Sequence, residues 1–317
     1  MFEIIVPGWY YYKSYFLKRS GKIFDQQALN CFFVSDLHGR VDRYETLFEC
    51  LVRERPAALF IGGDILPSPF AALRGGYELP YKDFIRDYLV KKFYDLKRRL
   101  MDSYPRIFAI LGNDDAKMEE IKMQEAEEQG LWEYCHNRCI PWSGFGVYGY
   151  SYIPPSPFRL KDWERFDVTD YVRPGCIAPG DERSAFTVRV DEREIRTATI
   201  ETDLQKLVGD NHLEKSIFLF HSPPHRCKLD RAALDGHRID DLQVDVHVGS
   251  TAIQRFIRQR QPLITLHGHI HESTRLTGAW RETFARTTAF NASHDGRELA
   301  LIRFDPYQPA KATRELI

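Results

Sequence analysis

The chain has 317 residues, 28% of them charged and 43% hydrophobic, and a formal net charge of −1. A chain of this length buries a sizeable core without staples, and six scattered cysteines do not make a disulfide scaffold. The near-zero net charge excludes the broad basic field of a dedicated nucleic-acid binder, so nucleic acid stays a possible partner but not a favoured one.

Residues 1–28 form an aromatic leader that basic side chains interrupt. It contains neither the apolar core of a signal peptide nor the ~20 apolar residues that a membrane span requires. We therefore expect a soluble, cytoplasmic protein that does not use a membrane as a partner. These patterns predict no particular oligomeric state.

The next part of the chain predicts a βαβ unit. An apolar run at residues 31–35 precedes residues 41–54, and a second apolar run follows at residues 58–61. The middle segment has the spacing of an amphipathic helix. Its apolar stripe consists of Tyr44, Leu47, Phe48 and Leu51.

A second, longer helix is expected after Pro80, because proline suits the first position of a helix. One face is apolar and the surrounding positions carry six Lys and Arg side chains. Packing on a sheet with a solvated basic face explains this pattern better than nucleic-acid binding does. The apolar stripe consists of Ile85, Leu89, Phe93, Leu96 and Leu100.

Regular patterns weaken between residues 144 and 190. Residues 146–150 and 185–190 alternate like strands, whereas the residues between them are irregular. Long irregular segments inside a compact chain are often functional. We expect an insertion at residues 151–182 that forms a lid or rim over the site. Its aromatic residues either stack on a substrate or pack the loop onto its own domain; they are Phe158, Trp163 and Phe166.

Ser250 is a suitable N-cap for a further helix, which Pro262 brings to an end. Beyond it, residues 287–294 and 297–304 flank Asp295-Gly296, a dipeptide that favours a two-residue hairpin. The second half is therefore expected to add antiparallel structure. Because no convincing linker divides the chain, we expect residues 1–317 to form a single domain.

Five short polar clusters each follow an apolar, strand-like run. In open α/β sheets, sites form at the carboxyl ends of buried strands. Imidazole and carboxylate together suit divalent first-row metals, and two ions about 3.5–4 Å apart need a bridging ligand, a role that suits Asp64. Each cluster alone is a weak signal for a metal site. The prediction is stronger because all five clusters directly follow a strand-like run. They are Asp36-Leu37-His38, Gly63-Asp64, Gly112-Asn113-Asp114-Asp115, His221-Ser222-Pro223-Pro224 and Gly268-His269-Ile270-His271.

In these clusters the chain resembles the calcineurin-like metallophosphoesterase superfamily, whose pattern runs Asp-x-His, Gly-Asp, Gly-Asn-x-Asp/Glu, His and Gly-His-x-His. The resemblance spans residues 31–293 or so. Residues 221–224, 247–250 and 266–273 look most like a poorly characterised prokaryotic phosphoesterase branch. The resemblance implies an α/β fold, a two-sheet αββα sandwich with mixed sheets and with helices outside.

The resemblance also implies two divalent metal ions, Mn²⁺ first and Fe, Zn, Ni or Co as alternatives. A water between the ions would attack phosphorus while the ions neutralise charge on the phosphoryl oxygens. The neutral amide of Asn113 could also face a phosphate oxygen without repelling it. One ion is implied to be held by Asp36, His38, Asp64 and His271, and the other by Asp64, Asn113, His221 and His269.

One position departs from the family pattern. Many members have His in the third position of Gly-Asn-x-Asp/Glu, where it protonates the leaving group or binds the phosphate, but this chain has Asp114. Two dications favour a charged carboxylate, which is a poor proton donor at neutral pH and repels a phosphate dianion. As a catalytic residue Asp114 would accept a hydrogen bond from a substrate hydroxyl or position water. Alternatively, it caps a helix at residues 116–128.

Four more residues lie in the clusters or next to them. Arg40 either binds a phosphate oxygen of the substrate or forms a surface ion pair. His225 and His267 are candidates for a substitute acid, and His225 also for substrate binding, although packing or hydrogen bonding is the simpler role for each. Asp115 is expected to orient a metal ligand.

The expected function is hydrolysis of phosphate esters, with phosphodiesters favoured over monoesters because of Asp114. The expected partner is a phosphate-ester substrate. One alternative is a catalytically weak protein of the same fold that acts as an interaction module. The other is a nuclease, in which the basic helix and the aromatic leader contact a strand.

Overall fold

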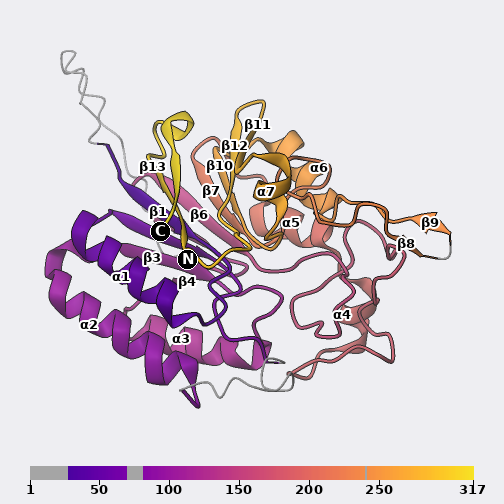
Figure 1. The fold of residues 1–317 in the computed structure, drawn as a ribbon, viewed down its shortest axis with the longest axis horizontal. Helices are drawn as coiled ribbons and strands as arrows, with labels where there is room; N and C mark the ends of the chain where they lie inside the picture. The colour runs from indigo at the N-terminus through magenta and orange to yellow at the C-terminus, as the bar shows by residue number, and fades with distance from the viewer. Residues whose placement is uncertain (1–27, 70–80, 240) are drawn as a thin grey trace, which may run out of the picture.

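The computed structural model describes residues 28–69, 81–239 and 241–317, which form two six-stranded sheets lying face to face between helices (Figure 1). The first sheet has the order β14-β13-β1-β2-β3-β4. Strands β1 to β4 are parallel, and β13 runs antiparallel to both of its neighbours. The strands span Cys31–Val34 (β1), Ala58–Gly62 (β2), Arg106–Ile110 (β3), Glu133–Tyr134 (β4), Ala300–Phe304 (β13) and Thr313–Leu316 (β14).

The second sheet has the order β11-β12-β10-β7-β6-β5, with parallel central strands and an antiparallel strand at each edge. A short hairpin, β8 (Arg238–Ile239) and β9 (Leu242–Gln243), belongs to neither sheet. Both sheets are mixed, so the predicted sandwich is confirmed. The strands span Cys139–Trp142 (β5), Phe145–Tyr150 (β6), Ser216–Phe220 (β7), Ile264–His267 (β10), Arg281–Phe284 (β11) and Thr287–Asn291 (β12).

Helices cover the outer faces of the sandwich, α1 to α3 beside the first sheet and α5 and α6 beside the second (Figure 1). None of the helices in the described part of the chain is both long and apolar enough to cross a membrane. The α-helices span Val41–Glu54 (α1), Val90–Leu100 (α2), Glu120–Glu128 (α3), Glu192–Thr197 (α4), Ile200–Val208 (α5), Thr251–Arg260 (α6) and Ser273–Thr277 (α7). Shorter turns of other helix types span Ile85–Leu89 (η2), Met101–Ser103 (η3), Lys117–Glu119 (η4) and Pro309–Lys311 (η5).

Successive residues of the central strands face two different apolar layers, because side chains alternate along a strand. Phe33 and Phe60 pack between the two sheets with Leu219 of β7. Their neighbours Phe32 and Leu59 pack beneath the helices. Strands buried on both faces read as continuous apolar runs, and this explains why the sequence revealed them.

The strongest sequence signals are confirmed. The five apolar runs that precede the polar clusters are β1, β2, β3, β7 and β10. The first predicted helix is α1, with the predicted bounds. Ser250 caps α6, since its hydroxyl accepts a hydrogen bond from the backbone N–H of Ile253 at 3.0 Å.

The basic helix is also confirmed as a solvated one. Pro80 lies outside the described residues, and the helical segment runs from Ile85, with the five stripe residues buried. Basic side chains on its outer face form ion pairs with nearby carboxylates, such as Arg86 with Glu125 and Lys92 with Glu45, each at 2.7 Å. These cations are already neutralised, and a nucleic-acid groove is not needed to explain them.

The predicted hairpin at Asp295-Gly296 is wrong. Strand β12 belongs to the second sheet, where it pairs with β10 and β11, whereas β13 belongs to the first sheet and pairs with β1 and β14. The dipeptide lies in a crossover between the sheets. Its turn preference is local, and the buried partners of two strands with apolar faces outweigh it.

The predicted strand at residues 185–190 is also wrong. Its β pairing consists of one isolated bridge, between Leu160 and Ala185. The backbone N–H of Thr187 donates to a carboxylate oxygen of Asp162 at 2.8 Å instead of joining a ladder. Alternation of side chains alone does not make a strand, and within the described residues this segment joins neither of the two six-stranded sheets.

Residues 151–182 are tightly anchored by a buried ion pair. Lys161 and Glu164 are both fully buried, with Nζ and Oε2 2.5 Å apart, and the backbone N–H of Ser156 donates to the same carboxylate. Burial lowers the pKa of Lys161, and burial raises the pKa of Glu164 to about 7 although Lys161 opposes it. Trp163 is fully buried too and packs against Tyr152, whereas Phe158 is exposed.

Lys161→Met should lower the free energy of unfolding by about 3–5 kcal/mol, because it leaves Glu164 buried without its cation. The double variant Lys161→Met/Glu164→Leu should recover most of that loss. Urea unfolding measures both, with the exposed Lys91→Met as the control, expected to change stability by less than about 1 kcal/mol. Equal effects at Lys161 and Lys91 would contradict a structural role for the buried pair.

Candidate metal centre

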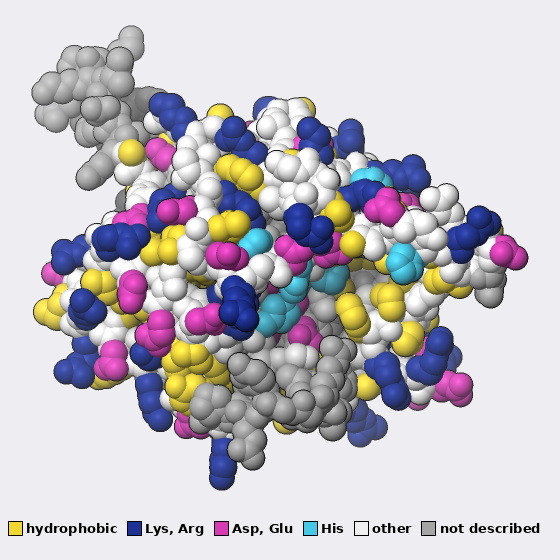
Figure 2. Space-filling view, in the orientation of Figure 1, with side chains coloured by type: hydrophobic (Ala, Val, Ile, Leu, Met, Phe, Trp, Pro, Cys, Tyr) yellow, Lys and Arg dark blue, Asp and Glu magenta, His cyan; other side chains and the backbone are white. Residues whose placement is uncertain are grey.

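The five polar clusters follow strands of both sheets, and the structure brings them to one end of the sandwich. Backbone hydrogen bonds tie the loops together. The N–H of Asp36 donates to the carbonyl of Gly63, and the N–H of Gly268 donates to the carbonyl of His221, each at 3.0 Å. Figure 2 shows histidine side chains gathered in a hollow on this face, with acidic side chains beside them.

Four of the predicted ligands have a left-handed backbone. Their φ angles are 56° at Asp36, 47° at His38, 49° at Asp64 and 72° at His269. This conformation costs about 1–3 kcal/mol at a non-glycine residue and persists where the surroundings hold it, often at functional sites. The sharp turns place each side chain at the junction of the sheets.

Two glycines of the clusters are required by close approach. A Cβ atom on Gly112 would overlap the carboxylate of Asp64. A Cβ atom on Gly268 would lie 2.5 Å from Oδ2 of Asp36. Only glycine lets the backbone come this near to a side chain. The site therefore requires residues without a Cβ atom at these two positions.

Asp36, His38, Asp64 and His271 form one group, in which the ligand atoms lie within 4.8 Å of one another. Nε2 of His38 lies 3.1 Å from Nε2 of His271. Nε2 of His271 lies 3.2 Å from Oδ1 of Asp36. Two ring nitrogens and two carboxylates therefore converge on one point.

Asp64, His221 and His269 form a second group, in which the ligand atoms also lie within 4.8 Å of one another. Asn113 joins it, since its Oδ1 lies 3.0 Å from Nε2 of His221. Asp64 belongs to both groups through one oxygen. Its Oδ2 lies 3.8 Å from Nε2 of His38 and 3.2 Å from Nε2 of His221, while its Oδ1 accepts a hydrogen bond from the N–H of Asp114 at 2.7 Å.

The structure thus brings all seven predicted ligands together, in the two sets that the resemblance implied. Four imidazoles, two carboxylates and one amide make a mixed nitrogen and oxygen donor set, which suits first-row divalent ions. Converging ring nitrogens repel one another unless a proton or a cation lies between them. The residues present therefore fit two cations, and their role as ligands stays a prediction.

Contacts outside the centre orient the imidazoles. Nδ1 of His221 lies 2.9 Å from the carbonyl oxygen of Gly62, so this nitrogen carries the proton and Nε2 faces inward. Nδ1 of His38 lies 3.3 Å from Oδ2 of Asp114. A carboxylate behind a ligating imidazole sets the tautomer and raises the basicity of the ring.

The charges of the protein hold the acidic groups ionised. Burial would raise the pKa of Asp36, but the hydrogen bond and charge of His271 outweigh it and lower the pKa to about 2. His221 and His38 likewise outweigh burial and hold the pKa of Asp64 well below its usual range. Burial lowers the pKa of His38 and of His221, but neighbouring carboxylates raise both to about 9. Metal ions and protons therefore compete for these imidazoles.

Asp114 does not cap a helix, which corrects one of the two predicted roles. The helical segment begins at Lys117, and no side chain of the preceding residue caps it. The N–H of Lys117 instead donates to Asp162 at 2.7 Å. Asp114 turns towards the centre, where its Oδ1 accepts a hydrogen bond from the hydroxyl of Ser68 at 2.8 Å.

Asp115 joins the loops of β2 and β3. Its carboxylate accepts hydrogen bonds from the backbone N–H groups of Ile65, Leu66 and Gly112 at 3.2, 2.7 and 2.8 Å. Burial, followed by the charge of Asp64, raises its pKa to about 7. This contact orients the backbone that carries Asp64.

Two of the remaining candidates have other partners. Arg40 forms an ion pair with Asp42 at 2.6 Å, which is the surface alternative, and its contact with a substrate stays a prediction. His267 is fully buried, with its ring nitrogens 2.9 Å from the carbonyl of Ser222 and 2.8 Å from the hydroxyl of Thr265. Burial lowers its pKa to about 4, which together with the two engaged ring nitrogens favours the packing role over that of a substitute acid.

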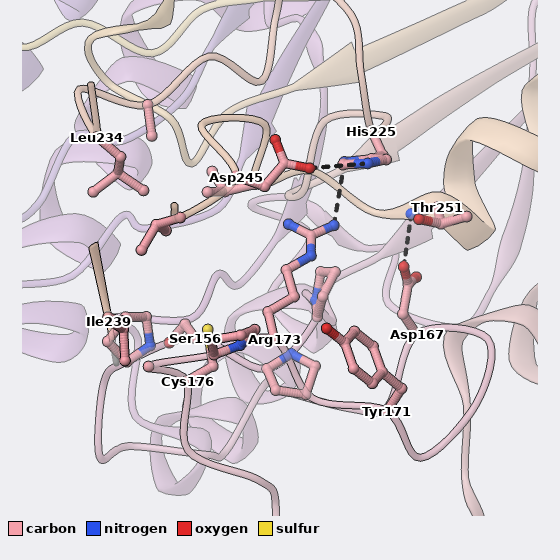
Figure 3. A pocket seen from close by; sticks show the side chains of 18 of the residues that line it. Ser156, Asp167, Tyr171, Arg173, Cys176, His225, Leu234, Ile239, Asp245 and Thr251 are labelled. Atoms are coloured by element: carbon pink, nitrogen blue, oxygen red, sulfur yellow. Dashed lines mark hydrogen bonds and ion pairs between the residues drawn. The ribbon is translucent and has the colours of Figure 1, made fainter. Parts of the chain in front are cut away.

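His225 lies in a pocket of about 870 Å³ that adjoins the centre, because His269 and Ile270 also line it. There its Nδ1 lies 3.2 Å from the guanidinium of Arg173 (Figure 3). Arg173 was not predicted. It lies in the irregular segment 151–182, where the absence of periodicity was the one available signal, and no spacing marks a single residue.

Comparison with known proteins agrees with this geometry. No curated protein matches the sequence. One solved crystal structure shares 17% identity and a TM-score of 0.56, over 92% of this chain and 99% of that chain. The crystal structure of TT1561 of Thermus thermophilus shares 15% identity and a TM-score of 0.52, over the same fractions. At these identities the likeness shows the fold alone.

The match to a family model carries more information than the solved structures do. The model described as calcineurin-like phosphoesterase matches residues 29–273, which is most of the chain. The matched range includes all five polar clusters and both sets of converging side chains. The chain therefore belongs to the calcineurin-like phosphoesterase family.

Proposed function

We propose that this protein hydrolyses phosphate esters with two divalent metal ions, Mn²⁺ first among them, and that it favours phosphodiesters over monoesters. Membership of a family of metal-dependent phosphoesterases supports the reaction class. One observation carries the binuclear part: a single oxygen of Asp64 faces two separate groups of ligand atoms.

In this proposal, two bound ions would lower the pKa of a water between them and neutralise charge on the phosphoryl oxygens. The protein supplies the frame. Asp36, His38, Asp64 and His271 would hold one ion, and Asp64, Asn113, His221 and His269 the other. The amide of Asn113 is neutral, so it can also contact a phosphoryl oxygen without repelling it.

Asp64→Asn should abolish hydrolysis of bis-(p-nitrophenyl) phosphate and reduce bound metal by at least one equivalent, because the variant lacks the bridging charge. We expect the rate of hydrolysis to fall by more than about 100-fold, because even groups that only hydrogen-bond a metal ligand contribute up to about 100-fold. Metal analysis and initial rates measure both effects. The control is Asp95→Asn, an exposed carboxylate on α2. Full metal content with undiminished turnover would contradict the assignment.

We infer a positioning role for Asp114 in addition to its predicted catalytic one. Its carboxylate contacts Ser68 on one side and Nδ1 of His38 on the other. With Nδ1 engaged, Nε2 of His38 is left to face the ion. Many members of the family have an imidazole in this position, and an imidazole would serve this purpose less well than a carboxylate.

Asp114→Ala should weaken Mn²⁺ binding by about 10–100-fold, the usual effect of removing a group that orients a ligand. Calorimetric titration with Mn²⁺ measures it without turnover. Ser68→Ala leaves the carboxylate in place and should cause a smaller loss. An unchanged affinity in Asp114→Ala would show that His38 needs no such partner.

The preference for diesters rests on the same residue. A carboxylate near the leaving group cannot protonate an alkoxide and repels the dianion of a monoester. Aryl leaving groups depart without a proton and are less affected.

Asp114→His should therefore raise kcat/KM for alkyl monoesters relative to aryl diesters. General acid catalysis contributes about 10²–10⁴-fold, so the change in ratio should be large. Rates are compared at saturating Mn²⁺ with metal content measured in parallel. Parallel behaviour of variant and wild type on both ester classes would place residue 114 away from the leaving group.

No observation in the described residues favours the other two functions. A protein that acts only as an interaction module would not require all seven predicted metal-ligand side chains. A nuclease would use the basic helix, yet two of its cations, Arg86 and Lys92, already pair with carboxylates. We further propose that residues 151–182 form a rim of the site, since they supply much of the lining of the adjoining pocket.

A further inference from the structure

The pocket beside the candidate centre has walls that take no part in it. Residues 154–158, 167–176 and 232–248 contribute most of the lining, and none of them belongs to the two ligand groups. His269 and Ile270 connect the pocket to the centre. A volume of about 870 Å³ is that of a small-molecule site.

The lining of the pocket includes three large apolar side chains that are exposed. Phe158, Tyr171 and Leu242 are 57%, 68% and 62% exposed, and all three line the pocket. Exposed large apolar side chains in a concave place indicate a binding surface. A bare phosphate or a small alkyl ester would leave these side chains in contact with water.

The pocket also contains a fixed cation, Arg173. Its guanidinium donates to the carbonyl oxygens of His247 and Gly249 at 2.8 and 2.9 Å. In Figure 3 it projects between the walls towards His225. Two carbonyls hold the group in place without neutralising its charge, so it is preorganised for an anion.

The carboxylates that line the pocket are engaged elsewhere. Asp167 accepts a hydrogen bond from the N–H of Thr251 at the start of α6, and Asp245 faces His225 and Arg226. Glu272 accepts from the N–H of Ala233. Within the described residues, no ion pair joins Arg173 to a carboxylate, and its charge is available to a ligand.

We propose that this pocket binds the organic part of a phosphodiester substrate that carries a flat apolar group with an anionic substituent, the group contacting apolar lining residues such as Tyr171 and the substituent pairing with Arg173. The inference rests on the proposed function for the scissile phosphate. It adds the chemical class of the substrate. The expected substrates are phosphodiesters with an aromatic group that carries an anionic substituent, such as a carboxylate.

Binding of phosphinates separates this pocket from catalysis, because their P–C bonds are not hydrolysed. Calorimetry on the Mn²⁺-loaded full chain compares diphenylphosphinate with dimethylphosphinate. Since a tenfold change in affinity corresponds to about 1.4 kcal/mol, less than a buried ring contributes, we expect diphenylphosphinate to bind at least about 10-fold more tightly. Tyr171→Ala should remove most of this preference, and Tyr94→Ala, an exposed tyrosine on α2, should leave it intact. Equal affinities for the two anions in the wild type would overturn the apolar part of the proposal.

The charge of Arg173 is tested with (4-carboxyphenyl)phenylphosphinate, which adds one carboxylate to a ring. It should bind about 10-fold more tightly than diphenylphosphinate, the usual effect of a charge-assisted hydrogen bond. Arg173→Gln should abolish this gain. Arg255→Gln should retain it, because Arg255 lines the same pocket but pairs with Glu201. No gain in the wild type, which requires no variant to fold, would overturn the anionic part.

The two proposals fail in different ways. The expected phosphinate preferences without hydrolysis of any diester would refute the proposed function and support the pocket. Hydrolysis of bis-(p-nitrophenyl) phosphate with no phosphinate preference would support the function and refute the pocket.

Discussion

The structure depends on how three buried carboxylates are stabilised at the junction of the two sheets. Asp36, Asp64 and Asp115 are 0%, 3% and 0% exposed. Charges so buried are strongly destabilising unless each has a partner. The partners are imidazoles from the second sheet and backbone N–H groups of adjacent loops. The loops of both sheets must therefore meet, and the left-handed turns and close glycines follow from that requirement.

The same constraint explains why the site can hold cations. Imidazoles that pair with the carboxylates take up protons, and a divalent ion satisfies both kinds of group at once. Asp64 is the residue on which this exchange depends, because its Oδ2 faces both groups while its Oδ1 is held by the loop of β3. Asp115 fixes the backbone next to it, and Asp114 holds the ring of His38 from behind.

Two kinds of segment supply the candidate site: the ends of regular strands supply the candidate metal centre, and irregular segments supply the pocket. The candidate metal centre comes from the ends of central strands, whose positions the sandwich determines closely. The pocket comes from irregular segments, which are anchored by the buried pair of Lys161 and Glu164 and by the contacts of Arg173 with two carbonyls. In many enzyme folds, binding and catalytic residues lie on irregular segments that a regular scaffold positions, and the candidate site has this construction.

The sequence by itself determined the central strands, α1, the cap of α6 and the side chains that form the centre, because buried strands and metal donors leave local patterns. It did not determine the partners of β12 and β13, which the turn preference of Asp295-Gly296 obscured, or the irregular course of residues 185–190. It also gave no sign of Arg173 or of the contact between Asp114 and His38. Those features were decided by tertiary structure, since sheet partners and side-chain neighbours depend on contacts between residues far apart in the chain, which no local pattern encodes.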